Sequence, residues 1–161
     1  MNVPREQISV ALFNLLSTNP QLTQLVKTFS RVPRPWQEVP TSERPYLLLF
    51  KGGPQTEGYV GQEEHPGLTR YVIHYNLWLY LTSDPAKKIT AETAINNIAD
   101  GIDNAFQTRS NGQPIITNRG ERQTLGGIVT NAYLVDGSEW GREFDDNNVV
   151  ICWLIAVQTG L

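Results

Sequence analysis

The chain has 161 residues, of which 40% are hydrophobic and 18% are charged. These values are typical of one soluble globular domain, here residues 1–161, that folds around its own core. The formal net charge of −3 argues against a general nucleic-acid binder, because such proteins usually carry a basic excess. No segment approaches the ~20 apolar residues that cross a bilayer, so no membrane contact is expected.

The first half of the chain predicts one helix, a connector and two strands. Apolar residues at helical spacing after Pro4 predict an amphipathic helix that ends near residues 17–20, with another short turn over residues 22–29. Prolines exclude regular helix and central strand from residues 30–40, which we interpret as a stiff, extended connector. Strands are predicted over residues 46–50 and 68–81, on either side of a long loop at residues 52–67.

The second half predicts a helix followed by a polar loop and two strands. The helix begins between residues 84 and 90 and ends near Phe106, and Gly101 weakens it by about 1 kcal/mol relative to alanine. A polar loop follows at residues 108–122, and strands are predicted over residues 127–135 and 148–158. This order predicts an α+β domain in which two helices pack on a mainly antiparallel β-sheet.

Few residues are candidates for catalysis or metal binding. Glu63, Glu64 and His65 are the raw material of a metal site or an acid/base pair, although a solvated loop explains them as well. Cys152 lies in an apolar run, where a thiolate is disfavoured, and no serine lies in a nucleophile elbow. We therefore expect no catalytic residue, cofactor or metal, and keep a metal-dependent enzyme using the Glu63–His65 group as the less favoured alternative.

Gly126 and Gly127 lie at the entrance to the strand predicted near residues 127–135. Adjacent glycines can cradle a phosphate, but that arrangement normally needs a helix behind the glycines rather than a strand. A structural turn or bulge at the entrance to the sheet is the favoured interpretation.

Arginine and tryptophan in the connector point to a protein interface. Arg31, Arg34 and Arg44 lie close in sequence to Trp36, and these residue types often anchor interfaces. The alternative is a surface loop folded back on its own sheet. Arg119 and Arg122, in the loop at residues 108–122, are further interface candidates.

Several sequence features together resemble the tail terminator proteins of long-tailed bacteriophages, the family of the phage lambda minor tail protein U. They run in order along nearly the whole chain: the helix from Arg5 to Leu16, Phe29-Ser30-Arg31 with the tryptophan-bearing connector, Arg44-Pro45-Tyr46-Leu47-Leu48-Leu49-Phe50, a long Gly/Glu loop, a Tyr/Leu/Trp strand, a second helix and Gln123-Thr124-Leu125-Gly126-Gly127-Ile128-Val129.

The resemblance implies a homo-hexameric ring on the last ring of tail tube protein, at the head-proximal end of the virion tail. Such a ring, assembled in the host cytoplasm, stops tube growth and offers its other face to a head-completion or neck protein. In contractile tails it also meets the tail sheath protein. DNA passes through the ring without sequence-specific binding. A head-to-tail joining or tail-completion neck protein is the structural alternative.

Overall fold

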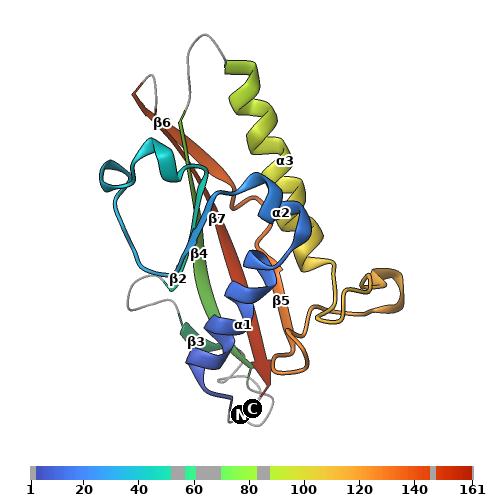
Figure 1. Cartoon of the computed structure of the whole chain (residues 1–161). Coiled ribbons are helices and arrows are strands. Elements are labelled where there is room, and N and C mark those ends of the chain that lie inside the picture. Colours follow the sequence, from blue (N-terminus) through green and yellow to red (C-terminus); the bar gives the residue numbers. More distant parts are fainter. Residues whose placement is uncertain (1–2, 52–56, 61–69, 83–87, 146–147, 161) are drawn as a thin grey trace.

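A computed structural model describes residues 3–51, 57–60, 70–82, 88–145 and 148–160 (Figure 1). The helices are α1 (Arg5–Ser17), α2 (Pro20–Leu25) and α3 (Lys88–Phe106), with short 3-10 turns η1 (Trp36–Glu38), η2 (Thr41–Glu43) and η4 (Thr117–Arg119). The strands are β1 (Thr28–Ser30), β2 (Tyr46–Lys51), β3 (Glu57–Val60), β4 (Arg70–Thr82), β5 (Asn131–Leu134), β6 (Trp140–Asp145) and β7 (Asn148–Gly160).

The seven strands of the described residues belong to one sheet with the order β1-β2-β4-β7-β5, in which β3 also pairs with β4 and β6 with β7. Among these pairs, β1 and β2 run parallel and the others are antiparallel. The longest strand pair in the sheet is β4–β7, which stays in register from Arg70 opposite Gly160 to Thr82 opposite Asn148. The predicted α+β fold with helices on a mainly antiparallel sheet is confirmed, with α2 as a short third helix.

One face of the sheet carries the main core. Because side chains alternate along a strand, Ile73, Tyr75, Leu77, Leu79 and Leu81 of β4 share this face and are all buried. They pack with the apolar sides of the helices, which contribute Ile8, Leu12, Leu16, Leu22, Ile98 and Ile102. Burial of each large apolar side chain stabilises the fold by about 1.5–3 kcal/mol, so this layer fixes the positions of the helices.

Gly101 in α3 has a packing role that could not be inferred from its helix propensity. A β-carbon at this position lies 2.8 Å from Cδ2 of Leu22 in α2. Real side chains do not approach so closely, so the glycine lets α2 and α3 pack together. The cost in helix propensity is therefore offset by a closer helix contact.

The other face of the sheet is covered in part by the connector, which in the structure spans residues 31–45 between β1 and β2. Tyr46, Leu48 and Tyr80 form a second buried cluster with Val39, and Trp36 packs against it. Cys152 belongs to this cluster, as its apolar surroundings in the sequence predicted, and burial raises the pKa of its thiol to about 11.

Some boundaries differ from the predictions. The segment Glu57–Val60, predicted as loop, is strand β3, and Trp140–Asp145, predicted as a connection, is strand β6. Strand β5 begins at Asn131 rather than at residue 127, because positive φ angles at residues 125–127 turn the chain before it enters the sheet. The short strand Thr28–Ser30 was also missed. Among the described helices, none is both long and apolar enough to span a membrane.

Candidate functional site

Arg44 holds the connector to the sheet from inside. Its side chain is buried, and its guanidinium donates to the carbonyl oxygens of Trp36 at 2.8 Å, Val39 at 2.9 Å and Leu81 at 3.3 Å. It also donates to the Asn148 side-chain oxygen at 2.6 Å. Buried polar groups need such partners, and here one cation satisfies acceptors from three separate parts of the chain. For Arg44 the structure therefore agrees with the alternative of a connector folded back on its own sheet.

Arg34 is half-exposed but also held within the connector. Its guanidinium donates to Glu43 at 3.2 Å and to the Glu38 carbonyl oxygen, and lies 5.9 Å from the centre of the Tyr46 ring. The Tyr80 hydroxyl donates to the Arg34 carbonyl oxygen at 2.6 Å, and burial raises the Tyr80 pKa to about 12. The backbone at Arg34 is thus fixed against the sheet.

The outward part of the connector lies around Val32. This valine is 67% exposed, the highest exposure among the large hydrophobic residues that the structure describes. Arg31 beside it forms an ion pair with Glu6 of α1 at 2.8 Å, and Trp36 is half-buried. We call Arg31, Val32 and the exposed parts of Arg34 and Trp36 the connector surface.

The second arginine-bearing segment, residues 107–124, follows α3 and is here called the arginine loop. It projects sideways from the end of α3 (Figure 1). Its backbone folds on itself: the amide of Ile115 donates to the Gln107 carbonyl oxygen at 2.7 Å, and that of Arg109 donates to the Gln113 carbonyl oxygen at 2.8 Å. These bonds give the loop a defined shape without a strand or a long helix.

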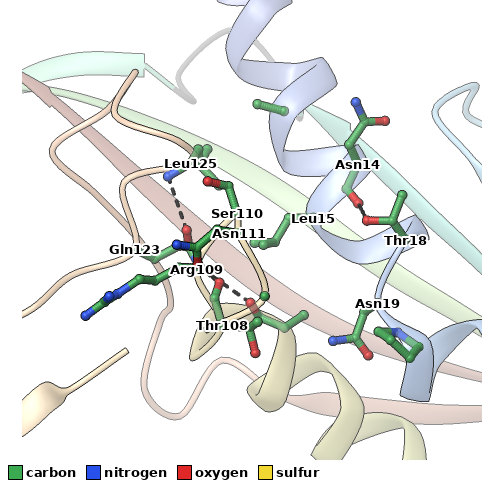
Figure 2. A pocket seen from close by; sticks show the side chains of 14 residues that line it. Asn14, Leu15, Thr18, Asn19, Thr108, Arg109, Ser110, Asn111, Gln123 and Leu125 are labelled. Atoms are coloured by element: carbon green, nitrogen blue, oxygen red, sulfur yellow. Dashed lines mark hydrogen bonds between the residues drawn. The ribbon is translucent and has the colours of Figure 1, made fainter. Parts of the chain in front are cut away.

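Gln123 anchors the arginine loop to α3. It is buried, and its side-chain oxygen accepts the Leu125 amide at 3.2 Å, while its amide nitrogen donates to the Thr108 carbonyl oxygen at 2.7 Å (Figure 2). The same nitrogen also donates to the Phe106 carbonyl oxygen at 3.2 Å. The last carbonyls of a helix lack partners within it, and Gln123 supplies one. We did not predict this role, although Gln123 begins the motif that ends in the two glycines.

Charge on the arginine loop is only partly neutralised. Glu121 accepts a bidentate pair of hydrogen bonds from Arg109 and one from the Ile116 amide at 2.9 Å. The Arg109 guanidinium is the main cause that lowers the Glu121 pKa. Arg119 and Arg122 are exposed, and no ion pair to either is found among the residues that the structure describes.

Gly126 and Gly127 lie in a turn, with φ angles of 79° and 93°. The Gly127 amide donates to the carbonyl oxygen of Thr124 at 3.0 Å and to its hydroxyl at 3.1 Å, and the next two amides donate to the same carbonyl oxygen. Amides that a phosphate cradle needs are therefore already bonded, and a strand follows rather than a helix. The geometry supports the structural turn over the nucleotide site.

A cavity of about 560 Å³ lies between the arginine loop and the junction of α1 and α2 (Figure 2). Its walls include Leu15, Asn19, Arg109 and Leu125. The described part of the chain contains no group of three or more possible metal ligands, whereas Glu63, Glu64 and His65 lie outside the described residues.

Comparison with known proteins yields a match of fold. No family model matches the sequence, and no curated protein matches it. Among solved structures, the chain is similar to a chain of the virion of a native gene transfer agent (GTA) particle, with 14% sequence identity and a TM-score of 0.54. The match covers 96% of this chain and 95% of that chain, so the two share their fold over nearly their whole length.

Proposed function

We propose that this chain is a structural, non-enzymatic virion protein that caps the tail tube as a hexameric ring. In this role it ends tail polymerisation at the head-proximal end of the tail and offers a surface for head or neck attachment. The observation that carries the proposal is the shared fold, over nearly the whole chain, with a chain of a virion particle. The ordered motifs that resemble tail terminators supply the specific position in the tail.

The connector surface is the patch that we assign to a protein neighbour, either the next subunit or the tube. Protein interfaces are commonly built on an apolar centre with arginine and aromatic residues, and Val32, Arg31 and Trp36 provide this combination. Arg44 and Tyr80 already fix the segment from behind. Docking therefore costs little ordering entropy, which favours binding.

The position of this surface suits a ring. Subunits in a closed ring contact one another through two different patches. The connector joins β1 to β2 at one edge of the sheet, whereas β5 and β6, side by side along β7, form the other edge (Figure 1). Each subunit thus has two unlike edges available for its two neighbours.

Val32→Glu tests this proposal more cleanly than a change at Arg34. A glutamate at position 34 faces Glu43 and removes internal hydrogen bonds, so loss of function there could reflect misfolding. Val32 is exposed, so a charge at this position leaves the core intact. The matched control is Val10→Glu, which makes the same change at another exposed valine, on α1.

Purified tail tubes that lack this protein are mixed with each variant and allowed to elongate. We expect the wild type and Val10→Glu to arrest tube growth, and Val32→Glu to keep its melting temperature but leave the tubes growing. If Val32→Glu arrests tube growth as well as the wild type does, the connector surface does not have the proposed role. Failure of the wild type to arrest growth overturns the proposed function itself.

A further inference from the structure

We propose that Arg119 and Arg122 of the arginine loop contact the phosphate backbone of duplex DNA. The inference rests on the proposed function only for the claim that DNA comes within reach of the chain. The rest follows from the charge, order and side-chain chemistry of the loop.

The arginine loop is a basic segment in an acidic protein. It holds three arginines against one glutamate, a net charge of +2, and this leaves −5 on the rest of the chain. Arg109 hydrogen-bonds Glu121, and the charge of Arg119 also helps to lower the Glu121 pKa, so this one carboxylate offsets only part of the charge of the loop. Neither Arg119 nor Arg122 forms an ion pair with an acidic side chain that the structure describes.

The loop holds these two arginines on a defined backbone. Gly120 ends the 3-10 turn of Arg119 in a left-handed conformation, with its amide bonded to the Thr117 carbonyl oxygen at 3.0 Å. Arg122 lies directly before the buried anchor Gln123. Only the two side chains need to be ordered on binding, which reduces the entropic cost.

The neighbouring side chains suit phosphate better than a protein surface. Phosphate contacts come from arginine together with small polar donors. The exposed, uncharged polar side chains of the loop are of this kind: Gln107, Ser110, Asn111, Gln113, Thr117, Asn118 and Thr124. Protein interfaces use aromatic and aliphatic anchors, whereas Ile116 is the one large hydrophobic residue of the described loop that is exposed.

This contact differs from that of a general nucleic-acid binder. Two phosphate contacts per chain give weak, sequence-independent binding with a salt slope of about −1.8. In a ring of six chains the same pair is repeated around the DNA, which raises the effective affinity without a change in any one contact. Weak individual contacts let DNA slide past.

The test is an NMR titration of the free chain with a 20-base-pair duplex DNA at low salt. It compares the wild type with Arg119→Gln/Arg122→Gln and with a matched control, Lys27→Gln/Lys51→Gln, which removes the same charge from two exposed lysines elsewhere. Arg119→Lys/Arg122→Lys keeps the charge and tests rescue. Sodium poly-glutamate is a second titrant that represents an acidic protein surface.

We expect duplex DNA to shift the amide signals of residues 117–122 in the wild type, the lysine control and the rescue variant. A tenfold rise in salt should weaken wild-type binding about 60-fold, and the Arg119→Gln/Arg122→Gln variant should lose the response with its spectrum otherwise unchanged. Absence of shifts in the wild type overturns the proposal, as does an equal response of the glutamine variant. Tighter binding of poly-glutamate than of DNA assigns the loop to a protein instead.

The titration is independent of ring formation. If the NMR titration shows no DNA contact, the tube-growth experiment still tests the proposed function. If the protein does not arrest tube growth, the titration still tests whether the loop binds DNA.

Discussion

The connector and the arginine loop carry three arginines each, yet the structure uses them in opposite ways. In the connector, Arg44 is buried among carbonyl oxygens, and Arg31 and Arg34 are each paired with a glutamate. In the arginine loop, Arg109 is the one arginine for which the structure describes an ion pair. The role of each arginine therefore depends on the acceptors that the fold brings to it, and not on the local density of charge.

The largest expected effect comes from removal of the buried connector arginine. Arg44→Met leaves the carbonyl oxygens of Trp36, Val39 and Leu81 without their donor in a buried place. We expect the free energy of unfolding to fall by about 3 kcal/mol or more in a urea denaturation. Arg31→Met, which removes a partly exposed ion pair, should cost less than about 1 kcal/mol. Equal effects of the two changes would remove the distinction between the buried and the exposed connector arginines.

Removal of the loop anchor should have the next largest effect. Gln123→Leu keeps the bulk but deletes the hydrogen bonds to Phe106, Thr108 and Leu125, so we expect a loss of about 2 kcal/mol. Hydrogen exchange should accelerate across residues 107–117. Gln113→Leu, a change of the same type at an exposed position in the loop, is the control and should leave both quantities unchanged. Unaltered exchange in the Gln123 variant would mean that the loop is held by something else.

The glycine turn at the end of the loop should respond to β-branching. Gly127 has φ of 93° with no atom within 4 Å of an added β-carbon, so we expect Gly127→Val to cost about 1–2 kcal/mol, mainly through backbone strain. Gly126 has φ of 79°, and a β-carbon added there lies 3.7 Å from the Ser110 hydroxyl oxygen, an ordinary contact distance. Gly126→Ala should therefore lower stability less than Gly127→Val does. Melting curves of both variants give the order. A Gly127→Val variant that melts like the wild type contradicts the structural role of the turn.

The smallest effect is a pH dependence of the loop. The Glu121 pKa is lowered, first by the hydrogen bond from Arg109, so its contribution is present above the ordinary glutamate pKa of 4.5 and is lost as pH falls through the lower folded value. The NMR signals of Arg109 and Ile116 should therefore move together with a midpoint below that of a free glutamate. Glu121→Gln should abolish the transition. A midpoint at or above the free value would show that the pair does not hold the loop.

Long periodic elements of the fold were predictable from the sequence. The alternation in β4 and the helical spacing in α1 and α3 are properties of single segments, and burial follows them directly. Strands β1 and β3 were missed because they have only three and four residues, and β6 because it depends on pairing with β7 rather than on an apolar pattern of its own. Their sequences alone, rich in polar residues or glycine, do not specify a strand.

The roles of the individual arginines were less predictable. Arg44 and Arg34 are ten positions apart in one proline-rich segment, yet the burial of Arg44 depends on acceptors at Leu81 and Asn148, far away in the chain. Gln123 likewise depends on the end of α3 lying beside it. A single sequence indicates which residues can bind, but the fold decides which of them are already bonded.

Electron cryomicroscopy of tail tubes mixed with the purified wild-type protein would show whether this chain caps the tube as a ring, as we propose. We expect a closed ring of six copies at one end of each tube, with the connector surface in contact with a neighbouring subunit or the tube. Bare tube ends at saturating protein, or copies bound along the sides of the tube instead of its end, would contradict it.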